Sequence, residues 1–273
     1  MKTSNLSQLT LEAKSFLGIR SLMPKPHFLG IGTQKGGTTS LYRILKQHQQ
    51  IFLPENKEIH YFTKFFTNER EWYTNHFKEA KAGQLRGEIT PYYLFHEAVP
   101  YRIKNFNRQM KFIVLLRDPV ERALSQYFHS VRLGLEDLCI EDAIENEDKR
   151  LLKSKSRISI PGQTDISHQE HSYISRSRYE IQLKRYLKLF KSANFLILRS
   201  EDLFESNLSI LDSISNFLGT KEFDPRIKIP KENQGLGEAN NVSLKMRRQI
   251  RHKLSETYNW VQEETGISWA DIN

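Results

Sequence analysis

A glycine-rich segment near the N-terminus has the composition of a phosphate-binding loop. The short apolar run 27–32, a predicted strand, leads into a loop and a predicted helix start that carry Lys35, Gly36, Gly37, Thr38, Thr39 and Ser40. Glycines let a backbone wrap closely around a phosphate, and the amides at a helix N-terminus point at it. Hydroxyl groups add donors, and the lysine adds a mobile charge. The segment therefore predicts a phosphate site rather than a glycine-rich turn that binds nothing.

The position of the lysine separates this loop from the ordinary P-loop, G-x-x-x-x-G-K-[ST]. Gly32 and Gly37 have the P-loop spacing, and Thr39 stands at the hydroxyl position. Thr38, however, occupies the lysine position, and the lysine lies three residues upstream at Lys35. In P-loop NTPases the lysine reaches the β- and γ-phosphates beside a magnesium ion. The displaced lysine favours a shorter donor with a single 5′-phosphate and one transferable group.

A second candidate anion site follows the apolar run 111–116. Arg117 ends this predicted strand, and Ser125 follows eight residues later on a helix that begins near Pro119. A guanidinium and a hydroxyl can thus converge on a phosphate at the strand's carboxyl end, where α/β folds bind ligands. The alternative is that Arg117 pairs with Asp118 while Ser125 faces solvent.

Several segments, taken together, resemble the sulfotransferases that use 3′-phosphoadenosine-5′-phosphosulfate (PAPS). QKGGTTSL (34–41) resembles their 5′-phosphosulfate loop, and RDPVERALS (117–125) resembles their 3′-phosphate motif. PENKEIHYF (54–62) resembles the K-E-x-H-[FY]-F signature of heparan sulfate and related carbohydrate sulfotransferases, and GEITPYYLF (87–95) their G-E-x-[ST]-P-x-Y segment. SRYEIQLKRYLKLF (177–190) is similar to a helix of bacterial and glycan-modifying members.

This resemblance covers roughly residues 27–265 and implies a role for each site residue. PAPS would be the co-substrate, bound by residues 35–40 together with Arg117 and Ser125. Glu58 would be the base, and Lys35 would also neutralise charge on the bridging oxygen of the leaving group. His60 would share a face with Glu58 if this segment is extended, and would orient the glutamate or the acceptor, or itself be the base. The plainer alternatives are a solvated glutamate and a satisfied histidine.

Two departures from the family pattern bear on the acceptor. Thr63 stands where glucosaminyl 3-O-sulfotransferases have an acidic residue, and Ile89 stands where heparan enzymes have lysine. We also expect no Golgi anchor, and the single cysteine cannot form the paired cysteines of the animal enzymes. We therefore expect a soluble prokaryotic-type enzyme that sulfates a hydroxyl or amine of a carbohydrate, glycolipid or small hydroxylated metabolite rather than heparan sulfate.

The order of predicted elements indicates how these residues are positioned. Strand-like and helix-like segments alternate, which predicts a three-layer, P-loop-like α/β fold with a central parallel sheet flanked by helices. We expect an N-terminal arm over 1–25 and a single sulfotransferase domain over 26–273. The polar stretches 149–171 and 224–241 are interpreted as long loops, candidates for acceptor contacts and a nucleotide lid. A last helix is predicted over 243–264.

Composition adds limits of its own. Lys and Arg exceed Asp and Glu by 41 to 32, a net charge of +9 that suits an anionic ligand without choosing one. The single cysteine, Cys139, excludes an internal disulfide, and we expect it to pack in a helix. No apolar run is long enough to cross a membrane and no secretory signal is evident, so we expect a cytoplasmic protein. No metal is predicted, and four histidines without ligand spacing are interpreted as structural: His27, His48, His76 and His96.

Two other function classes fit parts of the sequence. A P-loop small-molecule kinase would need a lysine at Thr38 and an acidic magnesium ligand, for which Asp118 is available. A non-catalytic module for anionic glycan or nucleic acid would explain the net charge and the basic run 247–253. A charged helix face explains that run more simply, and we predict no nucleic-acid partner.

Overall fold

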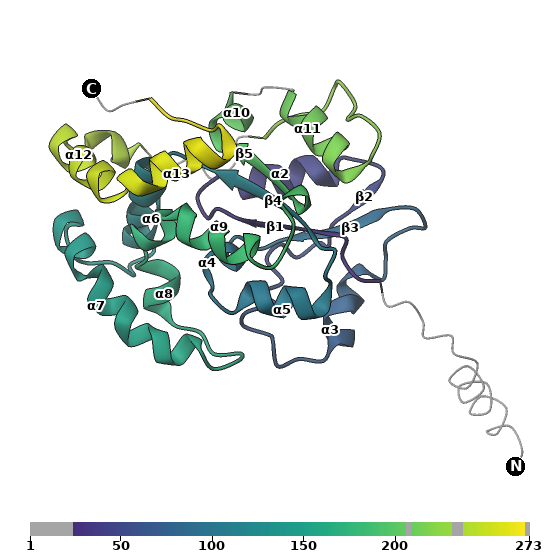
Figure 1. The fold of residues 1–273 in the computed structure, drawn as a ribbon, viewed down its shortest axis with the longest axis horizontal. Coiled ribbons are helices and arrows are strands. Elements are labelled where there is room, and N and C mark those ends of the chain that lie inside the picture. The colour runs from purple at the N-terminus through teal and green to yellow at the C-terminus, as the bar shows by residue number, and fades with distance from the viewer. Residues whose placement is uncertain (1–23, 206–208, 231–236, 271–273) are drawn as a thin grey trace, which may run out of the picture.

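A five-stranded parallel sheet forms the centre of the protein. The computed structural model describes residues 24–205, 209–230 and 237–270. The sheet has the order β2-β3-β1-β4-β5, and every neighbouring pair is parallel. Its strands are β1 (Phe28–Gly32), β2 (Ile51–Phe52), β3 (Leu85–Ile89), β4 (Lys111–Leu116) and β5 (Phe195–Arg199). This architecture confirms the predicted parallel sheet (Figure 1).

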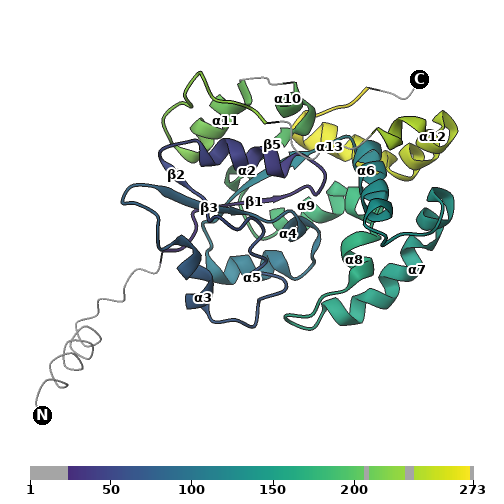
Figure 2. The same ribbon diagram turned by 180° about the vertical axis from the view of Figure 1, so that it is seen from behind.

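Alternate residues of the strands feed two separate apolar clusters, one on each face of the sheet. Leu29 and Val114 belong to the first cluster, whereas Phe28 and Ile113 belong to the second. The first is covered by α3 (Arg70–Thr74), α4 (Tyr92–Phe95), α5 (Val99–Phe106), α9 (Tyr179–Leu187) and α13 (Ser255–Thr265). The second is covered by α2 (Thr38–Lys46), α10 (Ser200–Phe204) and α11 (Ser209–Leu218). The result is the predicted three-layer arrangement (Figures 1 and 2).

A third group of helices gathers on one side of the sheet, at the left in Figure 1 and at the right in Figure 2. It comprises α6 (Pro119–Arg132), α7 (Ile140–Ile158), α8 (Ile166–Glu170) and α12 (Leu244–Lys253). The predicted long loop over 149–171 is therefore wrong, because most of it lies in α7 and α8. Buried polar contacts hold α7 in place: Arg150 forms an ion pair with Glu136 at 2.5 Å, and Glu147 accepts from the backbone N–H of Ile174 at 2.7 Å.

Other boundaries differ more modestly. The predicted helix over 243–264 is two helices, α12 and α13, which meet at Leu254. Within 224–241, residues 231–236 lie outside the described residues, as does the predicted arm except for residues 24 and 25. The prediction for Cys139 is wrong, because its side chain is exposed where α7 begins. Within residues 24–205, 209–230 and 237–270, no helix has the length and apolarity needed to span a membrane.

Candidate active site

The loop between β1 and α2 is shaped by the ends of the neighbouring strands. Thr33 donates to the Leu115 carbonyl oxygen of β4 through both its amide, at 2.8 Å, and its hydroxyl, at 3.0 Å. Ser200, the first residue after β5, donates through Oγ to the Gly36 carbonyl oxygen at 2.8 Å. Arg117 donates through Nη1 to the Lys35 carbonyl oxygen at 3.1 Å. Contacts from β4 and β5 thus fix the predicted phosphate loop.

Glycine is required at two positions in this loop. A Cβ at Gly36 would lie 2.5 Å from the Thr33 hydroxyl and 3.0 Å from the Leu115 carbonyl oxygen. Gly37 has a φ of 85° and is the N-cap of α2, which has no acidic residue in its first turn. Amides in the first turn of a helix have no partner within the helix, so they and the helix dipole favour an anion here. The predicted hydroxyl residues Thr38, Thr39 and Ser40 open this helix.

Lys35 lies among other cations at this loop. Burial and the nearby guanidinium groups of Arg132, Arg117 and Arg122 lower the pKa of Lys35 to about 8, and Glu170 opposes the shift. Cations that lower one another's pKa in this way favour the binding of an anion, because the anion would relieve their mutual repulsion. The structure therefore brings together two of the predicted cations, Lys35 and Arg117, and adds two that the sequence analysis did not single out.

Arg117 and Asp118 do not pair with each other among the described residues. Asp118 instead caps α6, accepting from the Glu121 amide at 2.9 Å, and also accepts from the Tyr258 hydroxyl at 2.9 Å. Burial raises the pKa of Asp118. Both oxygens of the Asp118 carboxylate thus have structural partners, which argues against the magnesium-ligand role in the kinase alternative. Ser125 is half-buried on α6, two turns before Arg132.

Glu58 and His60 lie in a turn beside the end of β3. The Glu58 amide donates to the Ile89 carbonyl oxygen at 3.1 Å. The segment is not extended, which was the condition for the expected shared face, because Glu58 and His60 both have left-handed backbones with φ of 65° and 57°. The turn nevertheless places His60 Nε2 3.5 Å from Glu58 Oε2. The two side chains therefore come together through left-handed backbone and not through an extended segment.

Glu58 carries its charge between two donors. Lys57 Nζ donates to Glu58 Oε1 at 2.5 Å, and His60 stands at the other oxygen. Burial raises the pKa of Glu58, but hydrogen bonds and charge from His60 and Lys57 outweigh it and bring the pKa to about 2. The Glu58 side chain is 38% exposed, and an acceptor that covered it would raise this pKa. Thr63 faces the second nitrogen of the His60 ring, with Oγ1 3.1 Å from Nδ1.

Several contributors were missed at the sequence level. Arg132 lies seven residues after Ser125 on one helix, a spacing that returns to the same face and could have identified it. Tyr179 lies within the segment 177–190 that resembles a family helix, and its hydroxyl donates to the Arg117 carbonyl oxygen at 2.9 Å. Arg122 is fully buried, a position that its charge did not suggest. Ser200 carries no sequence signal beyond its place after a predicted strand.

The four histidines interpreted as structural have local partners. His27 Nδ1 accepts from the Arg86 amide at 2.9 Å, and His48 Nε2 lies 2.9 Å from the Lys221 carbonyl oxygen. His76 Nδ1 lies 3.0 Å from the Trp72 carbonyl oxygen, and His96 Nδ1 accepts from the Ala98 amide at 3.3 Å. In the part of the chain that the structure describes, no three His, Cys, Asp or Glu residues are grouped so that they could hold a metal ion.

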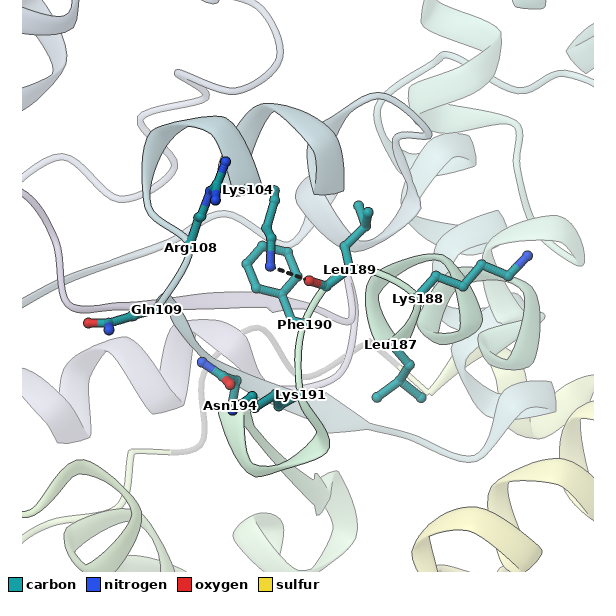
Figure 3. A pocket seen from close by; sticks show the side chains of 9 residues that line it. All are labelled: Lys104, Arg108, Gln109, Leu187, Lys188, Leu189, Phe190, Lys191 and Asn194. Carbon is teal, nitrogen blue, oxygen red and sulfur yellow. Dashed lines mark hydrogen bonds between the residues drawn. The ribbon is translucent and has the colours of Figure 1, made fainter.

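A basic cleft of about 410 Å³ lies elsewhere and is shown in Figure 3. Gln109 and Asn194, which line it, come just before β4 and β5, so the cleft is at the opposite edge of the sheet from the phosphate loop. Lys104 Nζ donates to the Leu189 carbonyl oxygen at 2.5 Å. The cleft holds none of the predicted site residues and is separate from the candidate active site.

Comparison with known proteins confirms the family resemblance. The family described as "Sulfotransferase domain" matches residues 25–256. The chain is 42% identical to the membrane-associated sulfotransferase kil1 of Dictyostelium discoideum over 114 residues, 41% of this chain and 24% of that protein. It is 28% identical to the mouse heparan sulfate glucosamine 3-O-sulfotransferase 5 over 204 residues, 74% of this chain and 55% of that protein. The matched regions thus span about half or less of these relatives.

Solved structures share the fold. A sulfotransferase from Alicyclobacillus acidocaldarius superposes with a TM-score of 0.65 at 22% identity, covering 85% of this chain and 95% of that one. Mouse sulfotransferase SULT7A1, complexed with PAP, superposes with a TM-score of 0.50 at 15% identity, covering 88% and 86%. These likenesses establish the P-loop-like α/β architecture of the chain.

Proposed function

This chain belongs to the sulfotransferase family, and on that premise we propose that it transfers a sulfuryl group from PAPS to a hydroxyl or amine of an acceptor. The observation that carries the proposal is the group of cations around Lys35, whose pKa their repulsion helps to lower. A phosphate-binding loop and a further strand-end arginine, Arg117, suit a donor with phosphates at both 5′ and 3′ positions. The PAP in the mouse SULT7A1 structure supports this nucleotide class.

In the proposed reaction, the phosphate loop and Arg117 bind the donor, and the Glu58–His60 turn acts on the acceptor. Residues 35–40 would hold the 5′-phosphosulfate, and Arg117 with Ser125 would hold the 3′-phosphate. The acceptor oxygen or nitrogen forms a bond to sulfur, and the bond from sulfur to the bridging oxygen of the 5′-phosphate breaks. Lys35 stabilises the charge that develops on that oxygen, and the acceptor proton passes to Glu58.

Glu58 is the preferred base over His60. Glu58 is ionised at neutral pH, since its pKa is about 2. His60 has one ring nitrogen facing Glu58 and the other facing Thr63 Oγ1, so we propose that it orients the carboxylate and the acceptor. A low pKa makes a weak base, and the acceptor strengthens Glu58 when it covers the carboxylate and separates it from Lys57.

A sugar-type acceptor fits best. The chain resembles curated relatives named as heparan sulfate glucosamine 3-O-sulfotransferases. Thr63 and Ile89 depart from the pattern of those enzymes, so we propose another carbohydrate, a glycolipid or a small hydroxylated metabolite. We further propose that residues 26–273 form one catalytic domain.

A transfer assay tests this function. The protein is incubated with PAPS labelled with radioactive sulfur and a panel of sugars, glycolipids and hydroxylated metabolites, and labelled product is measured in EDTA. We expect product with at least one sugar-type acceptor and none with Lys35→Ala. Transfer of phosphate from ATP in magnesium, with no sulfate transfer, would instead favour the kinase.

A further inference from the structure

The turn that carries Glu58 and His60 is held in an unfavourable conformation. Two residues with side chains, separated by Ile59, both have positive φ. Left-handed backbone in residues other than glycine costs free energy and persists where the surroundings fix it. The contacts that fix this turn therefore determine where the proposed base points.

A buried carboxylate, Glu88 of β3, lies against this turn. Glu88 is 2% exposed. Its Oε1 accepts from the hydroxyls of Tyr73 at 2.6 Å and Tyr93 at 2.9 Å, and its Oε2 accepts from the Thr90 hydroxyl at 3.0 Å. The backbone N–H of Ile59 also favours the charged form of this carboxylate and lowers its pKa. Glu88 thus lies against the turn at Ile59, the residue between Glu58 and His60.

A second link runs from the same carboxylate to the end of the turn. The Tyr93 hydroxyl, which donates to Glu88, accepts from the Phe62 amide at 3.3 Å. The Phe62 carbonyl oxygen in turn accepts from Arg102 Nη1 at 2.8 Å. Phe62, at the end of the turn, is therefore held by Tyr93, which also binds Glu88, and by Arg102.

Burying this carboxylate is costly, and its partners are all neutral donors. Burial raises the pKa of Glu88 to about 7, although the hydrogen bonds from Tyr73, Tyr93, Thr90 and Ile59 work to lower it. An apolar side chain would fill the same core position without that desolvation cost. The position is thus better explained by the geometry that the carboxylate imposes than by stability.

We propose that Glu88 is a positioning residue, which fixes the 58–60 turn so that Glu58 and His60 face the acceptor. The inference rests on the proposed function, because Glu58 is the proposed base. It assigns Glu88 no contact with donor or acceptor. Its loss should therefore lower kcat, leave donor affinity unchanged and move the His60 ring.

Glu88→Gln tests this proposal, with Glu147→Gln as the matched control. Glu147 is also a buried carboxylate, 2% exposed, and accepts from the amides of Ile174 and Ser175 at 2.7 Å each, away from the turn. Three quantities are measured in each variant: kcat for sulfuryl transfer, the Kd for 3′-phosphoadenosine-5′-phosphate (PAP), and the NMR signals of the His60 ring, assigned with His60→Gln.

We expect Glu88→Gln to lower kcat by about ten- to a hundredfold, because even a small displacement of the reacting group costs about this much in rate. The Kd for PAP should stay within about twofold, and the His60 signals should shift. Glu147→Gln should lower the melting temperature while leaving kcat and the His60 signals unchanged. Tyr93→Phe, which keeps the carboxylate but removes the link to Phe62, should give a smaller loss of kcat.

Two results would overturn the proposal: an unchanged kcat and unshifted His60 signals in Glu88→Gln, or equal losses of kcat in Glu88→Gln and Glu147→Gln. If Glu88→Gln does not fold, Tyr93→Phe and Thr90→Val give the same readouts. Failure of the proposed function would look different, because the wild-type protein would then transfer no sulfate. The His60 signals would still report whether Glu88 holds the turn.

Discussion

The phosphate loop and the Glu58–His60 turn lie along the same edge of the sheet, yet they are built in different ways. The loop is held by strand ends, through the Leu115 carbonyl oxygen of β4 and the Ser200 hydroxyl after β5. The turn has one strand-end bond, from the Glu58 amide to the Ile89 carbonyl oxygen of β3, and otherwise depends on side chains such as Tyr93, which links Phe62 to Glu88. A donor shared across a family suits a loop fixed by the sheet itself. An acceptor that varies suits a turn whose supports are side chains.

The two regions also differ in charge balance. Around the loop, cations lower the pKa of Lys35, and their excess positive charge favours the binding of an anionic ligand. In the turn, Lys57 and His60 already balance the Glu58 carboxylate and bring its pKa to about 2. The loop should therefore govern binding of the donor, and the turn should govern the chemical step.

The largest expected effect is on kcat in a Glu58 variant, and it distinguishes the role of the turn from that of the phosphate loop. Glu58→Gln should lower kcat by about a hundred- to ten-thousandfold, the usual contribution of a positioned general base. The Kd for PAP should change by less than about twofold, because the turn does not hold the donor. Single-turnover kinetics and calorimetry measure the two quantities. A weaker effect than that of His60→Gln would transfer the role of base to His60.

Arg117→Ala should give the opposite pattern. Loss of a charge-assisted bond to the 3′-phosphate should raise the Kd for PAP by about ten- to a hundredfold. Binding of 5′-AMP, which lacks that phosphate, should hardly change and serves as the control in the same calorimetric titration. Equal weakening of both ligands would mean that Arg117 supports the loop, through the Lys35 carbonyl oxygen, rather than the 3′-phosphate.

The charge of Lys35 should make donor affinity depend on pH. Its pKa is lowered to about 8, so the ammonium is charged below that pH and neutral above it. The Kd for PAP should therefore rise by up to about tenfold per pH unit above pH 8 and be nearly constant below it. Titrations of the Kd from about pH 6.5 to about pH 9.5 measure this slope. Lys35→Arg should remove it, and a slope that survives in that variant would contradict the assignment.

Ser125→Ala should have the smallest effect. A single hydroxyl bond to the 3′-phosphate is worth about a two- to tenfold change in the Kd for PAP. Ser130→Ala is a matched control on α6, because the Ser130 hydroxyl donates to the Glu170 carbonyl oxygen at 2.8 Å. An unchanged Kd in Ser125→Ala would remove Ser125 from the donor site while leaving Arg117 in place.

The sequence was most informative where apolar runs and glycines carry the structure. β4 has the bounds of the predicted apolar run 111–116, because that run ends at the charged Arg117. Helix α7 was missed because its buried face includes Glu147 and Ser154 between apolar residues, so the polar composition suggested a loop. Its burial depends on partners such as Arg150 and Glu136, which no local pattern reveals.

The candidate site shows the same division. The loop and Arg117 were predicted from residue types and spacing, since phosphate chemistry restricts both. The left-handed backbone of Glu58 and His60 could not be predicted, because it depends on contacts with β3 and with Glu88. The cytoplasmic location stays a prediction from sequence alone, and the acceptor class stays a proposal.

Calorimetric titration with PAP in EDTA, with ATP in magnesium as the comparison, tests the central claim most directly. The account predicts metal-independent binding of PAP that Lys35→Ala and Arg117→Ala both weaken, with Glu58→Gln unchanged. Binding of ATP with magnesium and none of PAP would contradict it and would favour a kinase. Binding of neither would mean that the cations around Lys35 serve another anionic ligand.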